Sequence, residues 1–403
     1  MTLPETPDRQ LILLPARNPM EASAWGSATM EYAAAFQPID FTRDPEAVDW
    51  LGYQHVTIIR PDFWPEDLPF IIKQANPAAI IDRVPVETPD ALQVIFNVRV
   101  YYGWRYGPQT AFDWSQLWPP GLALIGLHGR SSGEMQDADY PIIARARIEA
   151  VKLTSHATME TVKRLRALNR EMFILIRPMA SFGTTDQPRR VTPKEFVEWT
   201  ALDLNRLYAE DASLRYIEIH NEPNVRAEGL GASWNDGKEF GDWFLEVLAL
   251  YRQLFPEGRF GFPGLSPGPT VPGVGRVNAS EFLSEAAFAA QQADWIGLHS
   301  YWVNEAEMTD GREGFGFTGY RALFPEKLLF ITEFGNPRQS KAEVAAQYAR
   351  YYGMLRHVNG LGGIFAYVVS TPNLAESSPW AWRDEGGKDV GIAAEVGKRQ
   401  YVR

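Results

Sequence analysis

The fold prediction starts from the stretch Tyr216-Ile-Glu-Ile-His-Asn-Glu-Pro-Asn224. It begins as an apolar run, which is typical of a strand covered on both faces, and it ends in the polar pair Asn221-Glu222. Similar apolar runs occur on both sides of it along the chain, and most are followed by a helical pattern. Strands that alternate with helices predict an α/β fold with a parallel sheet.

The second part of the chain carries eight such runs. They cover residues 122–128, 146–153, 173–177, 216–222, 260–264, 295–301, 328–333 and 363–370. Helices are predicted between them at residues 159–169, 193–210, 237–254, 279–292 and 341–358. A (β/α)₈ barrel takes roughly 250 residues, so residues 121–403 predict a barrel of this type as one domain.

Residues 1–120 predict a smaller unit of unknown function. Residues 1–45 are rich in Pro and Ala with weak periodicity, and we expect an extended or loosely packed arm. Strands are predicted at 55–59 and 78–86, and helices at 66–75 and 89–102, the second capped by Thr88. Residues 103–120, with Trp104, Trp114 and Trp118, are interpreted as a linker.

Composition limits the classes of function. The net charge of −11 argues against a nucleic-acid partner and against an anionic membrane surface, and no run approaches the ~20 apolar residues of a membrane span. With no cysteine, disulfides and thiolate nucleophiles are excluded. Six histidines without a metal-binding motif predict neither a metal nor a cofactor. No signal peptide is visible, so the compartment stays unknown and an extracellular location stays open.

Polar residues collect at one end of the predicted strands. The strand ends carry His128, Lys152, Arg177, Asn221, Glu222, His299, Tyr301 and Glu333. Barrel enzymes place their chemistry at the carboxyl ends of their strands, so these side chains predict a site at the mouth of the barrel. Residues two apart on a strand share a face, which places Glu218 below Glu222 inside the barrel. A buried carboxylate needs a partner, and either Lys152 or Arg177 could supply it.

Three stretches resemble clan A glycoside hydrolases, the cellulase-like superfamily of (β/α)₈ barrels. Asn221-Glu222-Pro223 resembles the signature of their fourth strand, and Phe330-Ile-Thr-Glu-Phe-Gly335 resembles their seventh. Gly297-Leu-His-Ser-Tyr301 is similar to the His-x-Tyr of their sixth strand. The three matches fall on the expected strands in the expected order. The resemblance implies that Glu222 is the acid/base and Glu333 the nucleophile of a retaining glycoside hydrolase.

The resemblance also implies roles for the neighbouring side chains. Asn221 would bind the sugar 2-hydroxyl, Tyr301 would donate to Glu333, and His299 would contact the acid/base or the sugar. His128 stands where several clan members contact the sugar. Many members carry an Arg on the second strand, where this chain has Lys152, with Arg177 on the third. For the histidines, Asn221 and Tyr301, a purely structural role stays open.

Tryptophans in the loops after the strands are candidate platforms for sugar rings, since an aromatic ring offers a flat apolar face. Trp302 follows the sixth strand, and Trp380 and Trp382 follow the eighth. Burial in loop packing is the alternative for each.

The sequence therefore predicts an enzyme that cleaves β-glycosidic bonds of an oligo- or polysaccharide with two glutamates. Two alternatives stay open: a carbohydrate-binding barrel without catalysis, and a cell-wall-associated module. The sugar, the linkage and the oligomeric state are not predicted.

Overall fold

The computed structural model describes residues 9–399 except 66, 85, 87, 103, 104, 106–117, 119, 132, 133, 273, 274, 325 and 373–378. The chain divides into two compact units, Met1–Phe112 with Thr318–Pro325, and Asp113–Phe317 with Glu326–Arg403. No helix in the described part of the chain has both the length and the apolar composition that a bilayer crossing requires.

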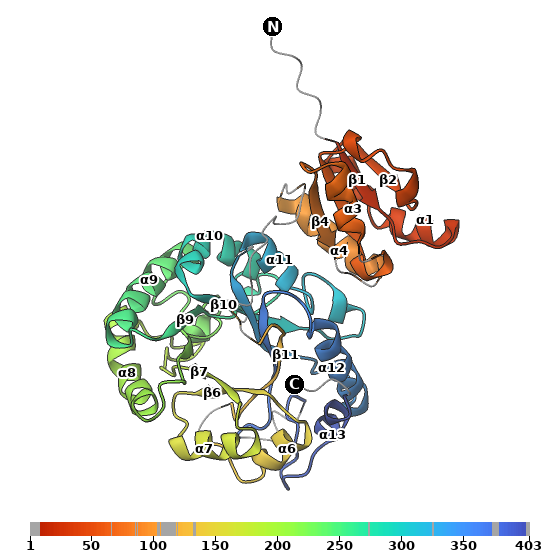
Figure 1. Cartoon of the computed structure of the whole chain (residues 1–403). Helices are drawn as coiled ribbons and strands as arrows, with labels where there is room; N and C mark the ends of the chain where they lie inside the picture. Colours follow the sequence, from red (N-terminus) through yellow and green to blue (C-terminus); the bar gives the residue numbers. More distant parts are fainter. Residues whose placement is uncertain are drawn as a thin grey trace. The chain divides into compact units, whose positions relative to one another are not determined.

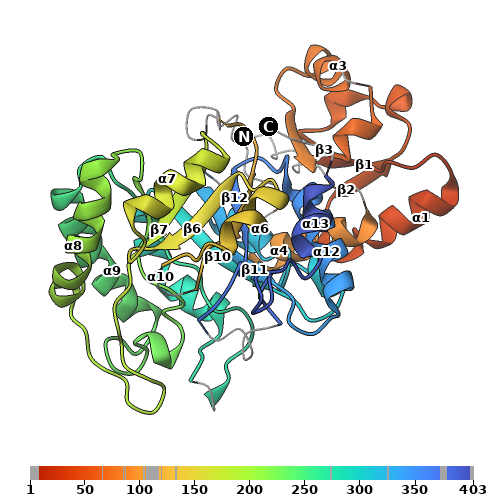
Figure 2. The same cartoon turned by 90° about the horizontal axis from the view of Figure 1, so that it is seen from below.

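The N-terminal unit contains a four-stranded parallel sheet in the order β2-β1-β3-β4. Its elements are β1 (Gln10–Leu13), α1 (Pro19–Ser27), α2 (Met30–Ala35), β2 (Ile39–Thr42), β3 (His55–Ile59), α3 (Leu68–Ala75), β4 (Ile80–Val84) and α4 (Pro89–Tyr102). Side chains of α1, α2 and α4 pack on one face of the sheet, and those of α3 pack on the other. Figure 2 shows α3 and α1 on opposite sides of these strands.

The prediction of a loose arm over residues 1–45 is wrong from Gln10 to Thr42, while residues 1–8 lie outside the described part of the chain. Successive side chains of β1 are buried against different helices, Leu11 with α3 and Ile12 with α1 and α2. A four-residue strand covered on both faces has no alternation that would mark it in the sequence. The Asn18 side chain accepts hydrogen bonds from the first-turn N–H groups of α1, which fixes where that helix begins.

The second unit is a closed barrel of parallel strands in the order β5-β6-β7-β8-β9-β10-β11-β12, which confirms the predicted (β/α)₈ fold. The strands are β5 (Leu124–His128), β6 (Ala150–Thr154), β7 (Phe173–Arg177), β8 (Tyr216–Glu218), β9 (Arg259–Phe262), β10 (Trp295–Tyr301), β11 (Leu328–Gly335) and β12 (Leu361–Ala366). Figure 1 shows these strands ringed by helices.

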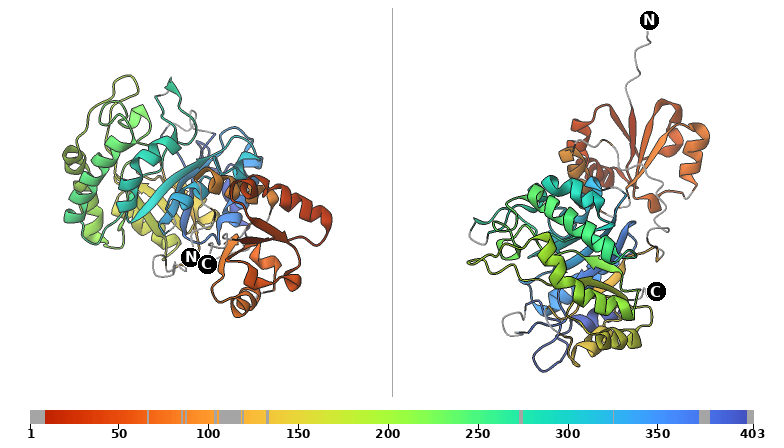
Figure 3. Two further views of the ribbon diagram at one scale, coloured as in Figure 1. Left: turned by 90° about the horizontal axis from the view of Figure 1, so that it is seen from above. Right: turned by 90° about the vertical axis from the view of Figure 1, so that its left-hand side faces the viewer.

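The helices in this part of the chain are α6 (Asp139–Arg145), α7 (Met159–Leu168), α8 (Pro193–Glu210), α9 (Gly237–Leu254), α10 (Ala279–Gln292), α11 (Phe317–Leu323), α12 (Lys341–Leu355) and α13 (Ile392–Gly397). All of α11 except Phe317 belongs to the first compact unit. Side chains cap the amino ends of α7, α8, α9, α10 and α12. Thr192 and Glu195 form a reciprocal capping box at the start of α8, and Ser340 and Glu343 form another at the start of α12. Figure 3 shows the long helices α8, α9 and α10 in green and teal, lying along the outside of the barrel.

The amino end of the barrel is filled by aromatic and aliphatic side chains. Trp118 belongs to this cluster, with ring edges packed against Phe173, Tyr216 and Phe330 at centroid distances of 5.3–5.9 Å. The predicted linker, 103–120, therefore contributes at least Trp118 to the barrel core, while Trp104 and Trp114 lie outside the described residues. Packing at this end leaves the opposite end, where the strands finish, as the place for polar groups.

Candidate active site

The carboxyl ends of the barrel strands bring together the polar residues that the sequence singled out. Glu333 of β11 is the centre of the group. Its carboxylate accepts hydrogen bonds from Lys152 Nζ at 3.1 Å and from Tyr301 Oη at 2.7 Å. Arg177 Nη1 lies 3.4 Å from the same oxygen that Lys152 contacts.

The surroundings of Glu333 favour its ionised form. Burial would raise the pKa of this carboxyl, but electrostatic interactions with its basic neighbours, His299 and Lys152 foremost, hold the pKa well below its usual value. Tyr301 stays a hydrogen-bond donor, because burial and the adjacent Glu333 raise its pKa well above the usual range. Glu333 is therefore a buried carboxylate that remains charged.

Glu222 lies beside Glu333 in a different environment. Its side chain is 23% exposed against 7% for Glu333. His299 Nδ1 lies 2.8 Å from Glu222 Oε1 and 3.8 Å from Glu333 Oε2. One oxygen of each glutamate and this nitrogen all lie within 4.8 Å of one another. Two carboxylates from distant parts of the chain thus face each other across a histidine.

Two glycines leave the space that the side chains of His299 and Glu218 occupy. A Cβ on Gly264 would lie 2.2 Å from the His299 ring, and a Cβ on Gly297 would lie 2.8 Å from Glu218 Oε1. Both approaches are closer than side chains tolerate, so the absence of a side chain at these positions is required for the site's geometry.

Lys152 supplies the partner of the buried Glu218, which settles the choice that the sequence left open. Lys152 Nζ lies 2.7 Å from Glu218 Oε2, and both side chains are fully buried. Burial would raise the pKa of Glu218, but Lys152, His299 and a hydrogen bond from Thr332 together outweigh it, so the pKa is lowered. One lysine therefore contacts two carboxylates, Glu218 below and Glu333 above.

The predicted alternation along residues 216–222 fails at His220. The strand β8 ends at Glu218, and His220 and Glu222 have φ of 79° and 40°. This left-handed backbone turns His220 out of the barrel into an aromatic cluster, 4.5 Å from the Phe182 ring. Burial lowers its pKa to about 3. His220 is thus a packing residue, and the turn that displaces it carries Glu222 to the rim.

Asn221 lies between two charged side chains. Arg177 Nη1 donates to Asn221 Oδ1, and Asn221 Nδ2 donates to Glu228 Oε1 at 3.1 Å. Glu228 was not predicted from the sequence; burial raises its pKa to about 6. It stands in a short turn after β8, in a loop without periodicity, so no sequence pattern marked it.

His128 stands close to Glu333 but has no exposed surface. Its Nε2 lies 3.8 Å from Glu333 Oε1, and its ring packs against Tyr367 at 5.3 Å. Burial, followed by the charge of Lys152, lowers the pKa of His128 to about 3, so the ring is neutral at neutral pH. Tyr367, which was also missed, has its pKa raised to about 12 by burial and then by Glu333.

Of the three tryptophans predicted as sugar platforms, only Trp380 remains a candidate. Trp302 is 1% exposed, stacked on Phe334 at 5.7 Å, and donates to Gln347 Oε1 at 2.9 Å. Trp382 is fully buried as well. Neither ring has a face left for a ligand, so both are packing residues. Trp380 is partly exposed, and its ring lies edge-to-face with that of Tyr301, next to the carboxylates, at a centroid distance of 5.1 Å.

Glu222, His299 and Glu333 also have the spacing of three metal ligands. The charges around them oppose a cation, because Lys152 Nζ and Arg177 Nη1 already lie within 3.4 Å of Glu333 Oε1. A divalent ion would have to displace or repel two fixed positive charges. The arrangement suits carboxylate chemistry better than metal binding.

Comparison with known proteins gives matches at low identity. No family model matches the chain. A threonine–tRNA ligase of Nitrosococcus oceani is 25% identical over 205 residues, which are 46% of this chain and 30% of that protein, so the chain spans less than a third of it.

The solved structures that are similar to this chain include glycoside hydrolases. One is a GH128 endo-β-1,3-glucanase from Amycolatopsis mediterranei, with a TM-score of 0.44, 15% identity, and 68% and 98% of the two chains covered. A GH30 endoxylanase from Clostridium papyrosolvens has a TM-score of 0.44 at 13% identity, covering 68% and 71%. A GH26 β-mannanase from Bacteroides ovatus has a TM-score of 0.45 at 11% identity, covering 71% and 89%. The chain is similar in fold to these glycoside hydrolases.

Proposed function

We propose that this protein is a retaining glycoside hydrolase that cleaves β-glycosidic bonds of an oligo- or polysaccharide, with Glu333 as nucleophile and Glu222 as acid/base. One observation carries the proposal: two carboxyl groups in unlike surroundings have oxygens within 4.8 Å of each other. Retaining enzymes have carboxyl groups about 5–5.5 Å apart, whereas inverting enzymes leave about 6.5–9.5 Å for a water molecule.

In the first step, a Glu333 oxygen attacks the anomeric carbon while Glu222 gives its proton to the departing glycosidic oxygen. The bond from the anomeric carbon to that oxygen breaks, and an ester between the sugar and Glu333 forms. The low pKa of Glu333 supplies the ionised nucleophile. Its hydrogen bond from Tyr301 and its contact with Lys152 hold the attacking carboxylate in place.

In the second step, Glu222 removes a proton from water, and the water oxygen attacks the anomeric carbon and releases Glu333. The partial exposure of Glu222 suits this role, since the attacking water, which returns a proton to Glu222, has to reach its carboxylate. His299 fixes the position of the Glu222 carboxyl through the 2.8 Å contact at Nδ1. We assign Asn221 and Trp380 to the sugar, one by hydrogen bonding and one by stacking.

The test uses the full chain on activated aryl β-glycosides and on a broad panel of β-linked glycans. Glu333→Gln and Glu222→Gln should each lower kcat by roughly 10²–10⁴-fold or more, whereas Glu246→Gln, on the exposed face of α9, should leave it unchanged. A 2-fluoro glycoside should label Glu333, as located by peptide mapping.

Two results would contradict the proposal. Labelling of any residue other than Glu333 would remove the assigned nucleophile. A wild-type protein that binds glycans of the panel but hydrolyses none would instead support the carbohydrate-binding alternative.

A further inference from the structure

The N-terminal unit has a cavity of about 470 Å³ at the carboxyl ends of its central strands. It lies between the segment that follows β1, with Pro15 and Arg17, and the segment that follows β3, with Arg60 and Phe63. In the order β2-β1-β3-β4, the chain leaves β1 toward one edge of the sheet and leaves β3 toward the other. Such a switch point opens a crevice at the strand ends, and small ligands of open parallel sheets bind there.

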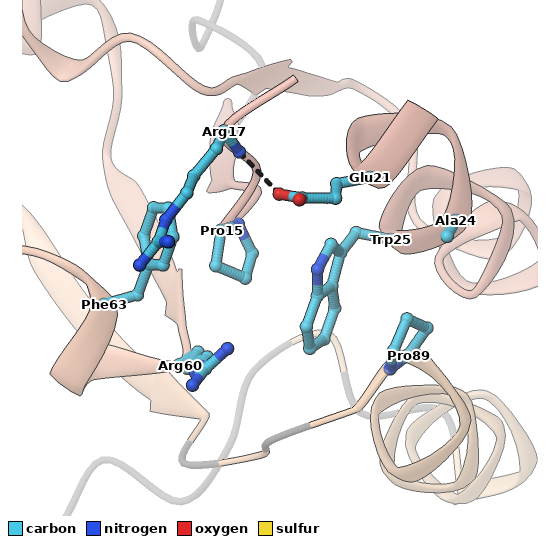
Figure 4. A pocket seen from close by; sticks show the side chains of 8 residues that line it. All are labelled: Pro15, Arg17, Glu21, Ala24, Trp25, Arg60, Phe63 and Pro89. Carbon is cyan, nitrogen blue, oxygen red and sulfur yellow. Dashed lines mark hydrogen bonds between the residues drawn. The ribbon is translucent and has the colours of Figure 1, made fainter. Parts of the chain in front are cut away.

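Two arginines give this cavity a cationic side. The Arg17 side chain is exposed, and its guanidinium lies 5.8 Å from the centre of the Phe63 ring. Arg60 Nε is buried and makes no hydrogen bond within the described residues; Asp62 Oδ2 lies 3.5 Å away and its side chain is 70% exposed. Figure 4 shows both guanidinium groups on the side of Phe63.

Arg60 also adopts a strained backbone. Its φ is 50°, in the left-handed region that residues other than glycine rarely adopt. Strain of this kind persists where the surrounding structure imposes it, and it gathers at ligand sites. Here it directs a charged side chain to the rim of the cavity instead of continuing β3.

The opposite wall is flat and apolar. The Trp25 indole and the Pro89 ring lie across the cavity from the arginines (Figure 4). The indole is 5% exposed and presents only an edge, whereas the Pro89 ring is partly exposed. Glu21 also lines the cavity, but its carboxylate already accepts the Arg17 backbone N–H at 2.8 Å and the Asn18 amide at 2.9 Å. The first N–H groups of α1 are likewise used by Asn18, so the anion-binding groups are the two guanidiniums.

We propose that this cavity binds a nucleoside phosphate, with the phosphate against Arg17 and Arg60 and the flat base between the partly exposed rings of Phe63 and Pro89. Guanidinium groups pair with phosphate oxygens through charge-assisted hydrogen bonds, and aromatic rings stack on planar bases. A volume of a few hundred Å³ suits a small ligand of this size. The site belongs to the N-terminal unit and is independent of the barrel chemistry.

The test is calorimetric titration of the full chain with the four ribonucleoside 5′-monophosphates, and with inorganic phosphate and adenosine for comparison. At least one nucleotide should bind saturably and more tightly than phosphate or adenosine. Arg17→Gln and Arg60→Asn should each weaken that binding by roughly tenfold or more, since each removes a charge-assisted contact. Arg43→Gln removes the same charge from an exposed position outside the cavity and should leave the affinity unchanged.

The proposal is overturned if none of the nucleotides binds saturably at millimolar concentration, or if phosphate alone binds as tightly as they do. Equal affinity in the wild type and Arg17→Gln would overturn it as well. Arg17 is the more robust variant, because its bond to Glu21 uses the backbone N–H and survives the substitution. Hydrolysis of glycosides by Arg17→Gln should match the wild type, which separates this test from that of the barrel.

Discussion

Substituting Lys152 with methionine tests the electrostatics of the barrel site most directly. Lys152 is fully buried, with Nζ 2.7 Å from Glu218 Oε2 and 3.1 Å from Glu333 Oε1. Methionine has a similar shape and no charge, so the change removes the cation without opening a large cavity.

The magnitude follows from these distances. At an effective dielectric constant of about 20, each pair attracts by roughly 5–6 kcal/mol. Most of that attraction offsets the desolvation of the buried charges, and removing one partner of a buried pair typically costs about 3–5 kcal/mol. We therefore expect Lys152→Met to lower the free energy of unfolding by about 3–5 kcal/mol at neutral pH.

The stability difference between Lys152→Met and the wild type should depend on pH. Glu218 and Glu333 have depressed pKa values in the folded chain, so their contribution to stability is present at neutral pH and lost as the pH falls through those values. Without Lys152 both pKa values rise. The stability difference between the variant and the wild type should therefore shrink toward roughly pH 4, where both carboxyls of the variant are protonated.

Urea unfolding at neutral and acidic pH, together with the pH profile of kcat/KM on an activated glycoside, checks this reasoning. The acidic limb of the profile should move to higher pH, because the carboxyl of Glu333, the proposed nucleophile, is harder to ionise. Adding Glu218→Gln to Lys152→Met removes the second buried charge, so stability should largely return while the limb stays shifted. Two results would refute this reasoning: a Lys152→Met variant as stable as the wild type, or a double variant, Lys152→Met with Glu218→Gln, whose acidic limb lies at the wild-type pH.

Three further predictions concern residues around the site. Glu228→Gln should raise the free energy of unfolding by about 2 kcal/mol above pH 6 and leave it unchanged below the unfolded pKa of about 4.5, because burial raises the pKa of Glu228 to about 6; urea unfolding at both pH values checks this. Trp302→Ala should lower the free energy of unfolding by about 3–5 kcal/mol, measured in the same way, since its ring is fully packed. Trp380→Ala should raise KM by roughly three- to tenfold in steady-state kinetics with little loss of stability, and an unchanged KM would exclude its role as a platform.

The sequence predicted the barrel best where local patterns and burial agree. Two strands have the predicted bounds, Phe173–Arg177 and Trp295–Tyr301, because parallel strands covered on both faces are continuously apolar. Three helices also have the predicted bounds, α8, α9 and α10, because the capping residues Thr192, Asp236 and Asn278 mark where they begin. In the N-terminal unit, β1 was missed because a four-residue strand buried on both faces has no alternation of polar and apolar residues in the sequence.

The grouping of polar side chains was predicted where they stand at strand ends. Residues whose surroundings depend on tertiary packing were missed or misinterpreted. Glu228 lies in a loop, and its burial depends on segments distant in sequence. Trp302 and Trp382 have the composition of a sugar platform, but only the fold shows that helix α12 covers Trp302 and that Trp382 is sealed inside. The left-handed backbone at His220 leaves no trace in the pattern, which is why the predicted strand ran four residues too far.

The left-handed conformation of Glu222 has a consequence for how the protein can change. At φ 40° a side chain costs about 1–2 kcal/mol that glycine would not incur. If stability were the only property under selection, a substitution of Glu222 by glycine would be favoured, because it would raise the free energy of unfolding. Persistence of an acidic side chain at this position in descendants of the chain would thus record selection for turnover, and its replacement by glycine would be an early sign that turnover no longer matters.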